Sequence, residues 1–125
     1  MYVADTHAWA RYLLNKLPDK SEKIFSDVEA FEDLMFVPTI CLNECIYLIE
    51  KKRLILDYKT LFSRFEEGNN FLIAPLDLEI TKIVPNIKLR ELHDRIIVAT
   101  AKFLGATLIT KDKEIIKSGI VKTIW

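Results

Sequence analysis

The sequence lacks a long apolar run, a net charge and any internal repeat, and each absence narrows the class of protein. No apolar segment approaches the ~20 residues that cross a bilayer, so the sequence does not predict a membrane protein. Eighteen basic residues balance eighteen acidic ones, so no overall positive field attracts nucleic acid. A local basic patch or a bound cation would still attract phosphate.

The composition is typical of a soluble globular protein. The chain has 125 residues, of which 50% are hydrophobic and 29% are charged. A chain of this length removes roughly two thirds of its unfolded surface from water, so we expect a single domain over residues 1–125. The strand-like segment Tyr2-Val3-Ala4 follows the first Met directly and leaves no room for a signal or transit peptide. The cytoplasm is therefore the expected location.

Short apolar runs alternate with segments of helical periodicity along the chain. The pattern predicts strands over residues 2–4, 35–37, 71–74, 106–109 and 120–125, and helices over 8–17, 19–31, 39–53, 56–67, 78–83, 94–104 and 113–118. An apparent capping box, Asp19-x-x-Glu22, opens the second helix, and residues 85–92 form a loop or a further helical turn. Strands that alternate with helices predict an α/β fold, a three-layer α/β/α sandwich whose central sheet is mainly parallel.

Four acidic residues are expected at one edge of this sheet. Asp5 and Asp112 each follow a predicted strand, and ligands bind at the carboxyl ends of parallel strands. Asp94 opens a helix that returns antiparallel to strand 106–109, which brings Asp94 near the end of that strand. Glu44 lies on the border of the apolar face of helix 39–53 and would face a cleft there. These four carboxylates form the candidate cluster.

A group of partly desolvated carboxylates requires a positive partner, because like charges repel strongly there. Mg²⁺ and Mn²⁺ prefer carboxylate and water oxygens, and such ions can orient a phosphodiester and activate a water molecule. A simpler interpretation of each acid also exists. Asp5, Asp94 and Asp112 precede predicted helices, where a carboxylate cap is worth ~1 kcal/mol, and Glu44 would then be a solvated residue.

Residues beside the acids have two interpretations each. The hydroxyls of Thr6 and Thr110 could hold a water molecule or a phosphate oxygen, or they could serve as local caps. Arg95 and Lys111 are close enough in sequence to contact phosphate, and a solvated face is the alternative.

The histidines and cysteines allow a further set of roles. His93 precedes Asp94 and is a candidate acid or base, or a plain surface histidine, and the same holds for His7. Cys41 and Cys45 lie four apart on a predicted helix, near the upper limit of distance for a disulfide, and we expect them in the core. Joined with the two histidines they would make a zinc set, but their spacing matches no zinc pattern.

Several motifs together resemble the PIN-domain ribonucleases, in particular the VapC-like toxins of type II toxin–antitoxin pairs. These motifs are Val-Ala-Asp-Thr-His-Ala at residues 3–8, Asn-Glu at 43–44, Leu-His-Asp-Arg-Ile-Ile-Val-Ala-Thr-Ala at 92–101 and Leu-Ile-Thr-Lys-Asp-Lys at 108–113. The resemblance covers the whole chain.

The resemblance implies a Mg²⁺- or Mn²⁺-dependent endoribonuclease that hydrolyses RNA phosphodiester bonds. It places the catalytic metal ligands on Asp5, Glu44, Asp94 and Asp112, all four of which are acidic here. It further implies a homodimer and a cognate antitoxin protein that lays a segment across the active cleft.

Two other functions remain open from the sequence. A PIN-like fold that keeps the acids would serve as an interaction module. An acid-rich α/β protein of another kind, such as a receiver or a haloacid-dehalogenase-like phosphatase, would require paired acids after the first strand or an Asp-x-Asp motif. The segment Asp5-Thr6-His7 supplies only one acid.

Overall fold

Five short parallel strands form one sheet in the order β3-β2-β1-β4-β5. The structure is a computed structural model that describes residues 1–125. The strands are β1 (Tyr2–Ala4), β2 (Met35–Pro38), β3 (Phe71–Ala74), β4 (Thr107–Ile109) and β5 (Thr123–Ile124). All four strand pairings are parallel, which confirms the expected α/β fold with its parallel central sheet.

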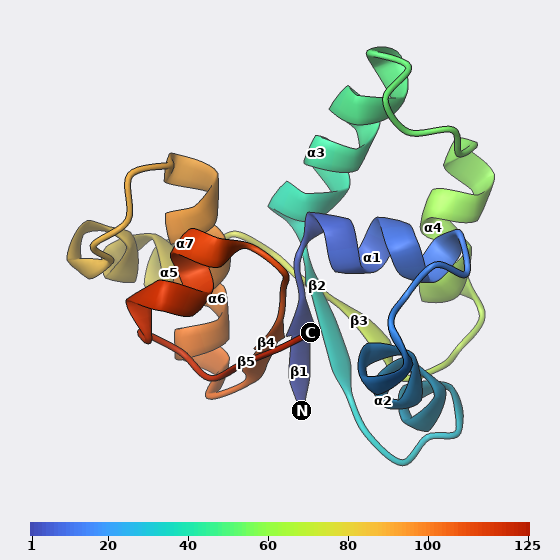
Figure 1. Ribbon diagram of the computed structural model, residues 1–125, viewed down its shortest axis with the longest axis horizontal. Helices are drawn as coiled ribbons and strands as arrows, with labels where there is room; N and C mark the ends of the chain where they lie inside the picture. Colours follow the sequence, from blue (N-terminus) through green and yellow to red (C-terminus); the bar gives the residue numbers. More distant parts are fainter.

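Helices cover the sheet on both sides (Figure 1). They are α1 (Thr6–Leu13), α2 (Asp19–Glu29), α3 (Thr39–Glu50), α4 (Tyr58–Glu66), α5 (Leu78–Ile83), α6 (Leu92–Leu104) and α7 (Lys113–Ser118), with a 3₁₀ turn η1 (Val84–Asn86). Figure 1 shows α1, α2 and α4 on one side of β1 and α5, α6 and α7 on the other. Right-handed crossovers produce this division, because the chain moves from β1 toward β3 and then returns past β1 to β4 and β5.

The central strands are buried because both faces of the sheet are covered. Val3, Ala4, Leu108 and Ile109 are fully shielded from solvent, and they belong to uninterrupted apolar runs. Such runs are typical of strands in a parallel sheet. No helix in the structure combines the length and the low polarity that crossing a bilayer would need.

Some predicted boundaries were wrong at the helix ends. The first helix stops at Leu13 instead of residue 17, and Asn15 turns the chain with a φ of 54°. The second helix stops at Glu29 because Phe31 adopts a left-handed φ of 63°, and its ring is 63% exposed. Lys52, with a φ of 57°, similarly follows a third helix that ends three residues early.

The expected capping box of the second helix is also wrong. Pro18 is the residue before the helix, and no side chain caps it. Asp19 lies within the first turn instead, where a carboxylate still interacts favourably with the positive end of the helix dipole. The last strand is shorter than predicted and contains only Thr123 and Ile124.

Helix α6 begins at Leu92, two residues before the predicted start. Glu91 precedes the helix, so Asp94 lies in its first turn and does not cap it. Residues Ile96 to Ala101 are all buried, because α6 packs against β1, β4, α3 and α5. Gly105 ends the helix with a φ of 62°, a left-handed conformation that favours glycine.

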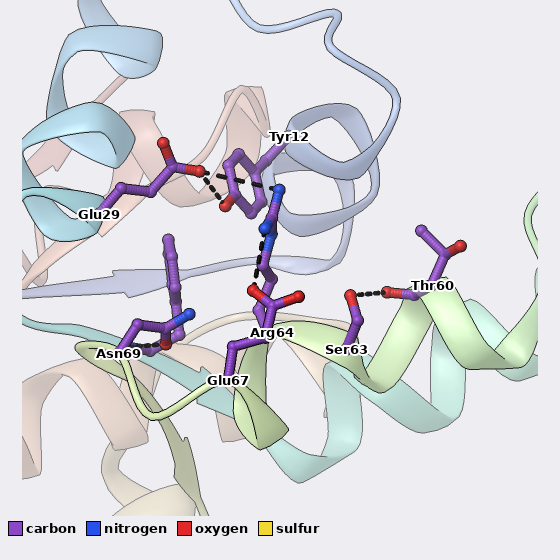
Figure 2. Close-up of polar contacts among 8 residues, drawn as sticks. Tyr12, Glu29, Thr60, Ser63, Arg64, Glu67 and Asn69 are labelled. Carbon is purple, nitrogen blue, oxygen red and sulfur yellow. Dashed lines mark hydrogen bonds and ion pairs between the residues drawn. The ribbon is translucent and has the colours of Figure 1, made fainter.

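A polar cluster joins α1, α2 and α4 (Figure 2). The Tyr12 hydroxyl donates a hydrogen bond to Oε1 of Glu29. Arg64 pairs with Glu67 at 3.0 Å and with Glu29 at 3.9 Å, and its guanidinium carbon lies 5.5 Å from the centre of the Tyr12 ring. Burial and the hydrogen bond to Glu29 raise the pKa of Tyr12. Three helices are thereby tied together around one aromatic ring.

The Tyr12→Phe substitution tests this connection. It removes the hydroxyl and leaves the Glu29 carboxylate without its donor, so we expect the free energy of unfolding to fall by about 1–2 kcal/mol. Urea denaturation followed by circular dichroism measures the change. The matched control is Tyr58→Phe, because Tyr58 is exposed and makes no side-chain hydrogen bond. Equal stability of the two variants would show that the hydroxyl contributes nothing.

Candidate active site

The site lies where the strand order of the sheet reverses. The chain builds β2 and β3 outward from one side of β1, and then β4 and β5 outward from the other side. β1 and β4 are therefore neighbours, with Ala4 opposite Ile109. In an open parallel sheet, ligands bind outside the carboxyl ends of the two strands at such a reversal.

Asp5 and Asp112 are fixed at these carboxyl ends by the helices that follow them. Oδ1 of Asp5 accepts a hydrogen bond of 2.8 Å from the backbone N–H of Ala8, so Asp5 caps α1. Oδ1 of Asp112 accepts one of 3.0 Å from the N–H of Ile115 and caps α7. The capping prediction is confirmed for these two acids. The caps also orient both carboxylates at the sheet edge.

Asp94 and Glu44 come from two further helices. Asp94 lies in the first turn of α6, so the capping prediction is wrong for this residue. Glu44 lies on α3, and its side chain is 29% exposed. Its Oε1 atom is buried without a hydrogen-bond partner, whereas Oε2 lies 3.8 Å from Nδ1 of His93. Helices α3 and α6 contact each other, which brings these two acids toward the strand ends.

The four acids influence one another electrostatically. Burial, and after it the charges of Asp112, Glu44, Glu91 and Asp5, together raise the pKa of Asp94 to about 6. Burial also raises the pKa of Asp5, which is 5% exposed, and the charge of Asp112 adds to this effect. Hydrogen bonds from Thr110 and Ala8 oppose the rise for Asp5. The structure thus brings Asp5, Glu44, Asp94 and Asp112 into one acidic cluster.

Glu91 is an acid of this region that the sequence analysis did not single out. It precedes α6, and its charge contributes to the raised pKa of Asp94. The sequence feature that could have identified Glu91 is its position three residues before Asp94, ahead of the apolar helix.

The polar residues beside the four acids differ in their exposure to solvent. Thr110 is fully buried, and its hydroxyl accepts a hydrogen bond of 3.0 Å from the N–H of Asp112. Thr110 also lowers the pKa of Asp5, so its hydroxyl lies near both capping acids. Thr6 is buried, and Arg95 is half-buried with an Nε atom that has no partner. Lys111 is exposed.

The chemistry of the cluster fits a hard divalent cation better than zinc. Its donors are carboxylate oxygens, the ligands that Mg²⁺ and Mn²⁺ prefer, and Oε1 of Glu44 is a buried acceptor without a partner. No three His, Cys, Asp or Glu side chains of the structure converge closely enough to hold one ion as they stand. Cys41 and Cys45 are free thiols in the core, and burial raises the pKa of both, to about 12 for Cys45.

Comparison with known proteins identifies the class to which this α/β protein with an acidic sheet edge belongs. Residues 2–119 match the PIN domain family. The chain therefore belongs to the PIN domain family. A comparison with curated proteins finds no match.

Several solved structures share the fold, among them a toxin–antitoxin complex from Klebsiella pneumoniae with a TM-score of 0.65 at 20% identity, over 100% of this chain and 97% of that one. VapBC2 from Rickettsia felis, bound to a promoter DNA fragment, matches with a TM-score of 0.73 at 19% identity, over 99% of this chain and 98% of that one. VapBC from Salmonella typhimurium bound to DNA gives 0.71 at 17% identity, over 98% and 96%. FitAcB from Neisseria gonorrhoeae gives 0.65 at 22% identity, over 100% and 97%. At these identities the similarity shows the fold.

The Asp94→Asn substitution tests the repulsion within the cluster. The folded pKa of Asp94, about 6, lies above the ordinary value of 3.8, so above pH 6 the fold bears the full cost of ionising this group. That cost is relieved as the pH falls from 6 toward 4. In metal-free buffer at pH 7.5 we expect the substitution to raise Tm by roughly 2–5 °C, a modest gain because solvent screens a partly exposed carboxylate.

The gain should disappear near pH 4, where the wild-type carboxyl is also neutral. Thermal denaturation at both pH values measures it. Glu50→Gln is the control, because Glu50 is an exposed acid on α3 outside the cluster. A lower Tm for Asp94→Asn at pH 7.5 would instead identify Asp94 as a structural residue.

Proposed function

We propose that the protein is a divalent-metal-dependent endoribonuclease that hydrolyses RNA phosphodiester bonds, and that it is the toxin of a type II toxin–antitoxin pair. The observation that carries this proposal is the cluster of Asp5, Glu44, Asp94 and Asp112 at the reversal point of the sheet. Membership of the PIN domain family supports it. The raised pKa of Asp94 supports it too, because a repulsive acidic cluster gains stability from a cation.

In this proposal the chain supplies four carboxylate ligands, which must draw closer together when the ion binds. Asp5, Asp94 and Asp112 are the principal ligands for Mg²⁺ or Mn²⁺, and Glu44 is a further ligand or the base that positions the attacking water. The bound ion would supply Lewis-acid activation of water and stabilise the leaving oxygen. The caps on α1 and α7 hold Asp5 and Asp112 at the sheet edge before substrate arrives.

Other residues assist in fixed roles. Thr110 fixes the backbone of Asp112 through its buried hydroxyl and lies near Asp5. We assign phosphate contacts to Arg95 and Lys111, and contact with a water molecule or phosphate oxygen to Thr6. A neutral chain requires such local positive groups to hold a polyanion.

Cleavage of a mixed pool of single-stranded RNA tests the activity. The wild type should cut RNA in Mg²⁺ or Mn²⁺ and lose this activity in EDTA. Asp94→Asn and Asp5→Asn should each lower kcat/KM by at least ~100-fold, because even residues that only support metal ligands are worth 10- to 100-fold. Gel analysis of end-labelled RNA measures the products.

Glu50→Gln is again the matched control, and we expect it to cut at the wild-type rate. Cutting that survives both the ligand substitutions and EDTA would contradict the metal mechanism. A wild type that binds no metal and cuts no RNA would favour an interaction module on a PIN fold.

We also propose a cognate antitoxin protein and a homodimer as the assembly, acting in the cytoplasm. The antitoxin is supported by a neighbour of the same fold, a toxin–antitoxin complex from Klebsiella pneumoniae. If the chain is a toxin, induced expression in bacteria should arrest growth, and Asp94→Asn should restore it at equal protein level. Growth curves with immunoblots measure this outcome, and arrest by both proteins alike would contradict a toxicity that depends on the acidic cluster.

A further inference from the structure

A groove adjoins the acidic cluster and shares Glu44 and Thr6 with the proposed site. It has a volume of about 410 Å³, within the ~300–1,000 Å³ range of small-molecule sites. α3 forms one wall, and the start of α1 and the first turn of α6 form the rest, with His7 and His93 at the rim. Figure 1 shows α3 rising away from the sheet beside the start of α1.

The spacing of residues on α3 gives this wall its character. Tyr47 follows Asn43, and Leu48 follows Glu44, by four positions, so these residues share one face of the helix. Glu44 belongs both to the groove and to the acidic cluster. A ligand in the groove would therefore lie directly beside the phosphate or metal ion at the acidic cluster.

The lining suits a flat, polar-edged ring. Tyr47 is 55% exposed, so its ring is available to stack on a ligand, and Leu48 provides an apolar floor. Nδ2 of Asn43 donates to the carbonyl oxygen of Thr39, and Oδ1 accepts no hydrogen bond within the protein. A carboxamide oxygen in this position can accept from the amino edge of a base.

The positive charge near the groove matches a nucleotide. Nζ of Lys51 lies over one face of the Tyr47 ring, 5.6 Å from its centre, which leaves the other face for a ligand. Proteins bind single-stranded RNA with this combination of aromatic faces and cations, and each stacked base contributes ~1–3 kcal/mol. The groove also presents two imidazoles and a carboxamide, which an aliphatic protein segment would leave without hydrogen-bond partners.

We propose that this groove is a nucleobase-binding subsite in which Tyr47 stacks on an unpaired base adjacent to the phosphate held at the acidic cluster. The proposal rests on the proposed function, because it assigns the same site an RNA substrate.

Binding of a single-stranded RNA oligonucleotide to the full chain tests the subsite. Fluorescence anisotropy is measured at low salt in EDTA, so that no cutting occurs. Tyr47→Ala should weaken binding by about 5- to 150-fold, the equivalent of one stacked base. Tyr47→Phe keeps the ring and should bind within about twofold of the wild type. Tyr58→Ala is the control, because Tyr58 is exposed on α4 and lies outside the groove.

A set of oligonucleotides with one abasic position, moved along the strand, makes the test specific. One such position should weaken binding to the wild type and leave binding to Tyr47→Ala unchanged, because the two changes remove the same contact. Circular dichroism checks that the variant is folded, as expected for a half-exposed side chain.

The outcomes separate the subsite from the nuclease. A wild type that binds RNA no more tightly than Tyr47→Ala does would overturn the subsite alone and would leave the groove to a segment of a partner protein. A wild type that neither binds nor cuts RNA would overturn the proposed function and the subsite with it.

Discussion

The parallel pairing of β1 with β4 is the constraint on which the rest of the site depends. These two strands lie side by side only because the chain reverses its direction of travel across the sheet after β3. Asp5 and Asp112 follow the carboxyl ends of these two strands and therefore lie at the same edge of the sheet. Each acid caps the helix that starts there. Without the reversal, the two capping carboxylates would lie at separate points of the sheet edge.

Two helices complete the cluster by the way they cover the sheet. α6 is buried over six consecutive residues, so it must lie against β1 and β4, and its first turn carries Asp94 to the same edge. α3 meets α6 and brings Glu44. Burial then makes ionisation of Asp94 unfavourable. A cluster of this kind lowers the stability of the metal-free protein and provides the electrostatic gain for binding a cation.

The sequence predicted the parts of the site that follow from local rules. The pattern of an apolar strand followed by an acid identified Asp5 and Asp112 as candidate site residues. The alternation of strands and helices predicted the parallel sheet. Capping was predicted for three acids and holds for two, because α6 starts at Leu92 and includes Asp94 in its first turn. Helix ends depend on residues in the left-handed conformation, such as Phe31. A phenylalanine, unlike a glycine, does not indicate this conformation in the sequence.

Properties that depend on packing between distant segments could not be predicted from periodicity. The effect of the Glu91 charge on the pKa of Asp94 depends on where α6 starts in the folded structure. The contact of Arg64 with Tyr12 and Glu29 joins three helices and follows from no local pattern (Figure 2). The groove beside Tyr47 likewise forms only where α3 meets α1 and α6.

The location of Mn²⁺ in crystals of the protein tests the central claim most directly. Anomalous scattering from crystals soaked at pH 7.5 identifies the ion independently of any activity. The account predicts a peak among the carboxylates of Asp5, Glu44, Asp94 and Asp112, and its loss in Asp94→Asn crystals. A peak elsewhere on the surface with none at the sheet edge, or an unchanged peak in the variant, would contradict it.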